Sequence, residues 1–185
     1  MKSIMICFFL SFAFFAQAQK GTTTFSVSYG DGKGIYKPIL AKAEMLGTYT
    51  KGPIRTFDLS LVGAISKIAS LEIGTSLLNH QYQFTEFTAL GNLVTESRSI
   101  NTLVFPIKLR FDILKYFFIS GGFMLHTDVG EHGSDLDFGV GIGVGVQYYF
   151  KNKYGVFIYL QRNIHRLTVG LVEEHVAFGL AYRFQ

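Results

Sequence analysis

Potential metal ligands are densest between residues 126 and 137. They are His126, Asp128, Glu131, His132, Asp135 and Asp137. Carboxylate oxygens and imidazole nitrogens this close together could hold a divalent cation. Their spacing, however, matches neither an EF-hand loop nor a zinc-binding motif. A solvated acidic surface loop is therefore the preferred interpretation of residues 127–136, no metal ligand is predicted, and a bound cation stays an open alternative.

A second set of reactive side chains lies around residues 164–173. It consists of His165, Thr168, Glu173, Glu174 and His175. A nucleophile and a base within hydrogen-bond reach could modify lipid A, yet no His-x-Ser arrangement accompanies this set. We therefore predict no catalytic residue and no cofactor. His80 is interpreted as a hydrogen-bonded histidine near the end of a strand.

Glycine alternates with branched apolar residues between Phe138 and Phe150, where Val140, Ile142 and Val144 each stand between two glycines. Period-two alternation indicates a strand with two different faces. An apolar face opposite a face of small or polar residues is typical of strands in a lipid-embedded barrel. The glycines do not fit the GxGxxG pattern, so nucleotide binding is not predicted.

Seven other segments alternate in a similar way. We predict strands at 22–30, 55–65, 69–82, 98–113, 116–126, 137–150, 154–163 and 174–184. Tight turns then alternate with longer connections at 31–54, 83–97, 127–136 and 164–173. Short periplasmic turns and long exterior loops are typical of outer-membrane barrels. The predicted fold is all-β: an eight-stranded antiparallel up-and-down transmembrane β-barrel.

Each strand is expected to turn one face to lipid and the other to the barrel interior. Phe157 and Tyr159 are assigned to the interior, opposite the glycines of the 137–150 strand, where a small residue leaves room for a large one. The interior charges are Asp58, Glu72, Lys108, Arg110, Asp112 and Arg183. Charges in a narrow barrel must be paired or hydrated. We therefore predict an ion-pair network that fills the lumen, with a narrow transport channel as the alternative.

The first 19 residues have the pattern of a cleavable signal peptide. Lys2 precedes an apolar stretch, which ends before the small-x-small sequence at residues 16–18. The single cysteine, Cys7, lies in this segment, so residues 20–185, the predicted barrel domain, carry no thiol chemistry. The net charge of +4 comes from basic residues dispersed among acids, which does not favour nucleic-acid binding.

Aromatic residues concentrate at the predicted periplasmic strand ends. They are Phe111, Tyr116, Phe117, Tyr148, Phe150, Tyr154, Tyr182 and Phe184. Such residues form interfacial girdles in membrane barrels. A soluble barrel with an apolar interior is the alternative, but its outer face would need abundant charge. Here the complementary face is largely Gly, Ala and Ser.

The final strand carries Phe178, Leu180, Tyr182 and Phe184 on one face. It resembles the C-terminal signal by which barrel-assembly machinery recognises outer-membrane barrels, although Gln185 follows the aromatic end. The segment 105–111, followed by 118–122 and the glycine-alternating strand, resembles small PorT-like barrels of Bacteroidota. The whole domain is similar in plan to OmpX- and OmpA-type barrels. The resemblance implies insertion into the bacterial outer membrane after export, without implying one activity.

The first predicted exterior loop is basic. Its cations are Lys33, Lys37, Lys42, Lys51 and Arg55. These side chains could pair with lipopolysaccharide phosphates, and an ordinary hydrated loop is the alternative. We predict a monomeric, non-enzymatic outer-membrane protein that contacts lipid, lipopolysaccharide and, during insertion, the barrel-assembly machinery. Its predicted role is envelope structure, surface interaction, or an accessory part in secretion or assembly; a transport channel and a lipid A-modifying enzyme are the alternatives.

Overall fold

A computed structural model describes residues 22–38, 48–49, 52–87, 93–129, 136–151, 153–166 and 169–184. The strands in these ranges are β1 (Thr23–Pro38), β2 (Thr48–Tyr49), β3 (Gly52–Ala64), β4 (Ala69–Phe87), β5 (Leu93–Ile113), β6 (Phe117–Asp128), β7 (Leu136–Phe150), β8 (Tyr154–Arg166) and β9 (Val169–Phe184). Within the same ranges, no helix is long and apolar enough to cross a membrane.

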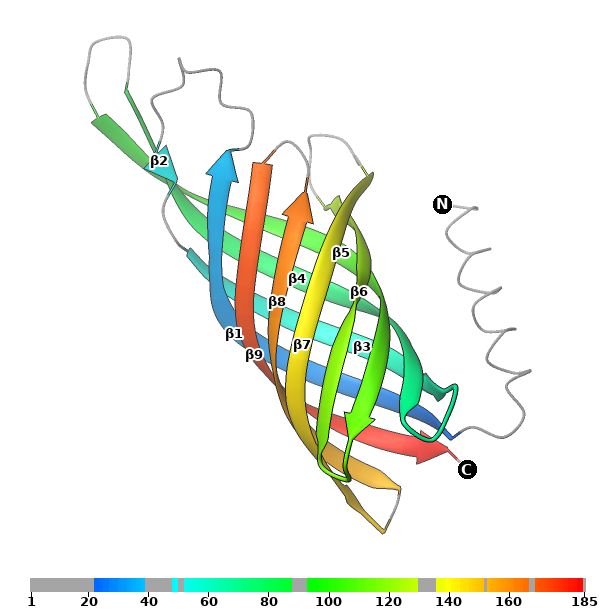
Figure 1. Ribbon diagram of the computed structural model, residues 1–185. Helices are drawn as coiled ribbons and strands as arrows, with labels where there is room; N and C mark the ends of the chain where they lie inside the picture. The colour runs from blue at the N-terminus through cyan, green and yellow to red at the C-terminus, as the bar shows by residue number, and fades with distance from the viewer. Residues whose placement is uncertain are drawn as a thin grey trace.

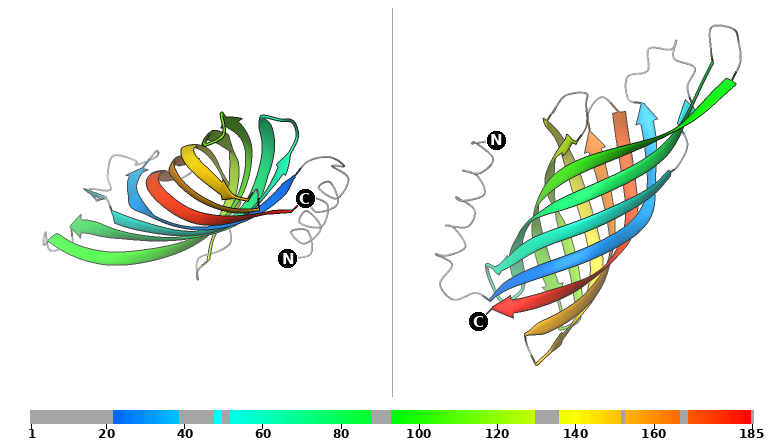
Figure 2. Two further views of the ribbon diagram at one scale, coloured as in Figure 1. Left: turned by 90° about the horizontal axis from the view of Figure 1, so that it is seen from below. Right: turned by 180° about the vertical axis from the view of Figure 1, so that it is seen from behind.

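Eight of these strands form a closed antiparallel barrel (Figures 1 and 2). Each strand pairs with its neighbour along the chain, and β1 pairs with β9 from Thr23↔Phe184 to Pro38↔Val169. Closure leaves no barrel strand without a partner on either side, as a membrane-spanning sheet requires. The two-residue strand β2 lies outside this ring, paired with β4. The predicted eight-stranded up-and-down barrel is confirmed.

The branched residues of β7 point out of the barrel. Val140 is 46% exposed, Ile142 66% and Val144 50%, whereas the glycines between them face the interior. Exposed large apolar side chains occur on β1 and on β3 to β9, so the outer face as a whole is apolar. A contiguous apolar face of this extent fits the hydrocarbon of a bilayer and would be unfavourable in water.

Aromatic side chains ring the end of the barrel at which β9 terminates. Tyr116 stacks on Tyr148 with 6.2 Å between ring centroids, and Tyr148 meets Phe150 edge-on at 4.9 Å. Tyr154 and Tyr182 lie 5.2 Å apart across the β8–β9 pair. The arrangement is that of an interfacial aromatic girdle.

At the opposite end, polar side chains on the outer face mark where the apolar surface stops. They are Lys33, Arg55, Asn79, Asn101, Arg162 and Glu174. Charged and amide groups are expensive in hydrocarbon, so this ring places the exterior boundary of the bilayer. The strand segments beyond it lie outside the membrane.

The strands continue further above this boundary than the sequence predicted. The interval 83–97 was expected to be a loop, but β4 runs to Phe87 and β5 begins at Leu93. The resulting two-stranded ribbon rises past the other strands (Figures 1 and 2). Apolar alternation ends at the bilayer surface, whereas backbone pairing continues through polar residues such as Gln83 and Ser97. The exterior loops 31–54 and 164–173 are shortened in the same way by β1, β3, β8 and β9.

The barrel interior is packed with side chains. Ile54, Leu78, Val104 and Met124 form a buried apolar cluster in the exterior half of the lumen. Polar and charged side chains occupy the remaining interior. Eight strands enclose a space that side chains can fill.

Candidate functional site in the barrel lumen

The third of the lumen nearest the C-terminal end of β9 contains an Arg110–Asp112–Gln147 cluster. Arg110 Nε lies 3.3 Å from Asp112 Oδ1, and the guanidinium also donates a hydrogen bond to Gln147. Gln147 Nε2 donates to the same Asp112 oxygen at 2.8 Å. The guanidinium stacks 3.7 Å above the Phe118 ring. Each polar group of the cluster therefore compensates another, as charges in a narrow interior require.

Arg183 lies in the lumen close to the chain end of β9, where its guanidinium stacks on Tyr149 at 3.9 Å. Its Nε has no hydrogen-bond partner among the residues that the structure describes. The stacked ring shields one face of the cation and attracts it through the ring quadrupole. Of the six predicted lumen charges, Arg110 and Asp112 form an ion pair, whereas Arg183 is held by an aromatic ring.

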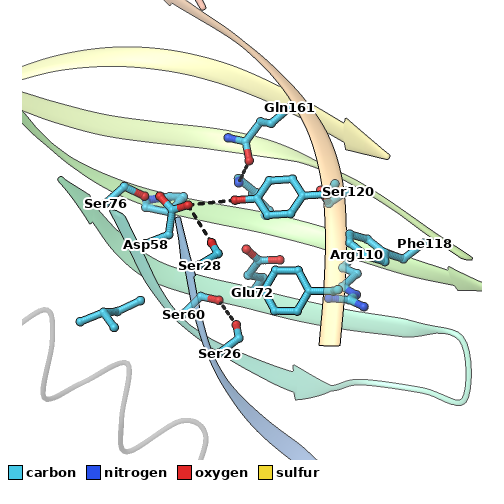
Figure 3. A pocket seen from close by; sticks show the side chains of 15 residues that line it. Ser26, Ser28, Asp58, Ser60, Glu72, Ser76, Arg110, Phe118, Ser120 and Gln161 are labelled. Carbon is cyan, nitrogen blue, oxygen red and sulfur yellow. Dashed lines mark hydrogen bonds between the residues drawn. The ribbon is translucent and has the colours of Figure 1, made fainter. Parts of the chain in front are cut away.

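The middle of the lumen holds a small polar cavity of about 30 Å³ (Figure 3). Asp58 lies on its wall, where Oδ2 accepts hydrogen bonds from Ser28 at 2.9 Å and from Tyr159 at 3.0 Å. Ser26 and Ser60 hydrogen-bond at 2.6 Å. The volume is enough for one or two water molecules. Glu72 and Lys108 also line this cavity, so all six predicted lumen charges do face the interior.

A chain of side-chain hydrogen bonds leads from this cavity toward the exterior. Lys108 Nζ donates to Gln161 Oε1 at 2.9 Å, and Gln161 Nε2 donates to Asn163 Oδ1 at 2.7 Å. Asn163 Nδ2 then donates to Glu173 Oε2 at 3.2 Å. Both amide dipoles point the same way, with a cation at one end and a carboxylate at the other. Such aligned hydrogen bonds reinforce one another in a low-dielectric interior.

Two histidines extend the chain to a second carboxylate. Glu173 Oε1 lies 2.9 Å from His165 Nε2, and His165 Nδ1 lies 3.2 Å from His126 Nδ1. His126 Nε2 lies 3.3 Å from Asp137 Oδ2. We call the four residues Glu173, His165, His126 and Asp137 the histidine chain. It connects β9, β8, β6 and β7 across the exterior end of the lumen.

Glu173 has no exposed surface. Burial opposes its ionisation, but the neighbouring His165, the hydrogen bond from Asn163 and the nearby His175 together hold the pKa of this carboxyl below its ordinary value. The side chain is therefore a buried carboxylate at neutral pH.

Glycines on the interior face of β7 make room for this arrangement. A Cβ at Gly139 would lie 3.3 Å from His165 Nδ1, and one at Gly141 would lie 2.5 Å from Asn163 Oδ1. Because β7 lies between β6 and β8, the missing side chain at Gly139 lets His165 reach across to His126.

The predicted glycine partner of one of the two interior aromatics, Phe157, needs correction. Phe157 and Tyr159 do face the lumen, but the Phe157 ring occupies the space beside Gly179 on β9, where an added Cβ would lie 2.2 Å away. Tyr159 does lie opposite a β7 glycine, because it pairs directly with Gly145, and a Cβ at Gly143 would lie 3.9 Å from its ring. The direct cross-strand pairing Phe157↔Gly179 explains the difference, since neighbours opposite each other are closest.

His80 and His175 are buried beside the histidine chain. Removal from water lowers the pKa of His80; Glu173 opposes this effect and His165 adds to it. His80 occupies space left by Gly34 on β1, where a Cβ would lie 2.6 Å from its Nε2. The predicted hydrogen-bonded strand-end histidine is thus an interior residue, 1% exposed, next to the apolar cluster.

The two sets of reactive residues singled out in the sequence meet inside the barrel. His126 and Asp137 come from the first set, and His165 and Glu173 from the second. Residues 130–135 and Thr168 lie outside the described ranges. Among the residues described, no three His, Cys, Asp or Glu side chains are grouped so that they could hold a metal ion.

The histidine chain is not predictable as a unit from alternation along single strands. Its signal was present in the strand register, because Asp137 pairs directly with His126 and Glu173 with Asn163. The contact between His165 and His126 skips a strand, so it depends on Gly139 and on barrel curvature. Alternation along single strands does not reveal such a contact.

The predicted lipopolysaccharide-contact residues are only partly within the described ranges. Lys33 and Arg55 are exposed on the outer face at the exterior boundary. Lys37 lies in β1, and Lys42 and Lys51 fall outside the described residues. The predicted assembly-signal residues Phe178, Leu180 and Phe184 are exposed on the outer face of β9, with Tyr182 half-buried.

Solved structures with a similar fold include several outer-membrane barrels. The N-terminal β-barrel domain of Pseudomonas aeruginosa OprF aligns with a TM-score of 0.51 at 13% identity, covering 89% of this chain and 100% of that domain. Outer membrane protein AlkL, solved in lipid bilayers, gives 0.52 at 12% identity, with 89% and 90% coverage. The Yersinia pestis outer membrane protein Ail in a nanodisc gives 0.50 at 15% identity, with 89% and 100% coverage.

No protein-family model and no curated protein matches the chain by sequence. The similarity to these structures therefore establishes the barrel fold and no particular activity.

Proposed function

We propose that this protein is a non-enzymatic barrel of the bacterial outer membrane that acts through its exterior surface, as an envelope or surface-interaction protein. The filled lumen carries the proposal. Hydrogen bonds run from Lys108 through Gln161, Asn163 and Glu173 to the histidine chain, and the lined cavity holds about 30 Å³. A hydrated ion path needs a continuous opening. Side chains fill this interior instead, which supports a plugged barrel.

The same interior argues against catalysis at the exterior end of the lumen. Glu173 is 0% exposed and His165 is 3% exposed, and each faces another member of the histidine chain. A catalytic base must reach the proton it abstracts within hydrogen-bond distance. Buried side chains whose polar atoms already contact one another are poorly placed for a lipid or peptide substrate.

The exterior ribbon of β4 and β5 is the part of the molecule best placed for a partner. Its outward side carries uncharged hydrogen-bonding groups. They are Asn79, Gln81, Gln83, Ser97, Ser99 and Asn101. Asn79 Nδ2 donates to Ser99 at 3.0 Å and to Asn101 at 2.7 Å, which orders the base of the ribbon. An ordered polar surface beyond the bilayer supports a role in surface interaction or as an accessory of a larger assembly.

Conductance and crosslinking test this proposal. In a planar bilayer the wild-type protein should give no stable ion-selective current; such a current would favour the transport alternative. A photoreactive residue at Gln83 should crosslink an exterior partner in intact cells, whereas the same residue at lipid-facing Ile142 should not. Equal capture of proteins at both positions would contradict a role for the ribbon.

We further propose lipopolysaccharide as a lipid partner at the boundary ring. Lys33 and Arg55 lie exposed where headgroup phosphates would be, and cationic side chains pair well with phosphate oxygens. Vesicles containing lipid A should bind the wild-type protein better than a Lys33→Gln, Arg55→Gln variant. Equal association would leave these side chains as ordinary hydrated surface.

A further inference from the structure

The histidine chain contains three contacts, and each contact places two electronegative atoms 2.9 to 3.3 Å apart. The first joins a Glu173 oxygen to His165, the second joins the two imidazoles, and the third joins His126 to an Asp137 oxygen. At such a distance, two bare lone pairs repel each other, and a proton between the two atoms removes that repulsion. Glu173 Oε1 and His165 Nε2 are buried and have no formed hydrogen bond among the described residues, so a proton turned between them would satisfy both.

Two neutral imidazoles supply only two of the three protons. A neutral ring carries hydrogen on one nitrogen and a lone pair on the other. If His165 protonates Nδ1 toward His126, then its Nε2 lone pair faces Glu173. If it protonates Nε2 instead, then His126 must supply the shared Nδ1 proton and faces Asp137 with a lone pair. One contact is always left without a proton.

We propose that the exterior end of the lumen is a binding site for one additional proton, held on His165 between a buried carboxylate and a neutral imidazole. His165 is then an imidazolium that faces Glu173 through Nε2 and donates Nδ1–H to His126. His126 is neutral, with its hydrogen on Nε2 toward Asp137. All three contacts are satisfied with both carboxylates ionised.

His165 is the better position for the additional proton because its carboxylate partner is completely buried. Glu173 has no exposed surface, whereas the Asp137 side chain is 22% exposed. A buried carboxylate gains more from an adjacent cation than one that water can solvate. Asn163 satisfies the other Glu173 oxygen, leaving Oε1 for His165.

A fourth proton would break the chain. Two imidazolium rings would then present Nδ1–H groups to each other at 3.2 Å, with like charges facing in a poorly hydrated interior. The other titratable or charged groups that face this site from the described elements are Asp58 on β3, His80 on β4, Lys108 on β5 and His175 on β9. Acidification therefore breaks the His165–His126 contact and loosens the exterior ends of β6 and β8, while the Arg110–Asp112–Gln147 cluster stays intact.

Nitrogen-15 spectra of the imidazoles test the proton count, with the folded protein in phospholipid nanodiscs at pH 7. The expected result is one doubly protonated ring, His165, and a His126 ring protonated on Nε2. Glu173→Gln should discharge His165, because a glutamine amide can donate to a neutral ring. Glu174→Gln is the matched control, one residue along β9 on the outer face, and should leave His165 charged.

Two neutral rings in the wild-type protein would overturn the proposal, as would loss of the His165 charge in Glu174→Gln.

Hydrogen exchange tests the acid response. Amides at the exterior ends of β6 and β8 should lose protection when a second ring protonates. His126→Gln keeps an acceptor and a donor but cannot take up a proton, so this variant should stay protected at the same pH. Equal acid opening in wild type and His126→Gln would contradict the response.

Discussion

Glycine at the interior positions of β7 decides which side chains can meet inside the barrel. In the sheet Gly139 lies between Met124 and His165, and a Cβ there would press on both side chains. A Cβ at Gly141 would likewise press on Asn163. The alternating sequence thus has a role on each face of the strand. Its valines and isoleucine face lipid, and its glycines leave room for the polar side chains of His165 and Asn163.

Gly139→Val should destabilise the barrel. Its Cβ would lie 3.0 Å from the Ile164 carbonyl oxygen and 3.3 Å from His165 Nδ1, before the two methyl groups are added. We expect a loss of about 1–3 kcal/mol in the free energy of unfolding, the usual effect of overpacking. Urea titration in phospholipid vesicles measures it.

The neighbouring Val140→Ile is the control for Gly139→Val. Val140 is 46% exposed on the lipid side, so an added methyl group should change stability by less than about 0.5 kcal/mol. Equal effects of the two substitutions would mean that the interior at Gly139 is not tightly packed.

Stability should fall as pH is lowered. Burial holds the pKa of His80 below its ordinary value of 6.5. Below pH 6.5, His80 therefore binds a proton in the unfolded chain but not in the folded protein. The lowered pKa of Glu173 adds a second loss below its ordinary value of 4.5, when the unfolded carboxyl protonates first. The urea midpoint should therefore decline from about pH 6.5 and again below pH 4.5.

His80→Gln removes the first of these titrations, so the variant should lose less stability than the wild type between pH 6.5 and 4.5. A midpoint that stays constant from pH 7.5 to 5 in the wild type would contradict the assignment of His80 as a neutral interior residue.

Among the structural elements, the tight β5–β6 and β7–β8 turns each contain a residue in a strained conformation. Leu114 has φ of 60° in the β5–β6 turn, and Lys151 has φ of 47° in the β7–β8 turn. Side chains other than Gly, Asn and Asp rarely adopt this left-handed region, because Cβ approaches the following carbonyl oxygen. The tight turns are retained despite that cost because they set the register of the hairpins.

Leu114→Asn should stabilise the β5–β6 hairpin by up to about 1 kcal/mol, since asparagine accepts positive φ more readily. Lys115→Asn, the adjacent residue without positive φ, is the matched control and should give no gain. Unfolding in urea compares the two variants. A stabilisation by Lys115→Asn equal to that of Leu114→Asn would show that the backbone conformation is not the cause.

Sequence alternation predicted the strands well where one face meets lipid. There, the chemical difference between the faces is largest, as at Val140 and Gly141. It predicted the exterior ends poorly, because the outer face of β4 and β5 turns from apolar to polar at Asn79 and Asn101 and the contrast between the faces is lost. Residues 83–87 and 93–97 pair as strands through backbone hydrogen bonds, which polar side chains neither require nor prevent.

At the scale of the molecule, barrel closure brings together groups that the sequence keeps far apart. Lys108 and Gln161 hydrogen-bond across 53 positions, and Asp58 and Tyr159 across 101. The interior location of the six charges followed from strand parity, but their partners did not. Partners depend on curvature and on which neighbours are glycine, as Phe157 beside Gly179 shows.

We infer that the branched and aromatic faces of the strands meet lipid while the small and polar faces fill the lumen. The chain has no tryptophan, so a single introduced indole reports its own surroundings without background. Ile142→Trp places it at a position that is 66% exposed on the outer face, and Phe118→Trp places it in the lumen, where Phe118 is 3% exposed. Both variants are reconstituted in vesicles of brominated phospholipid, whose bromine atoms quench fluorescence on contact. The emission of Ile142→Trp should be strongly quenched and that of Phe118→Trp should persist; the reverse pattern, or equal weak quenching at both positions, would contradict a lipid-embedded barrel with a filled interior.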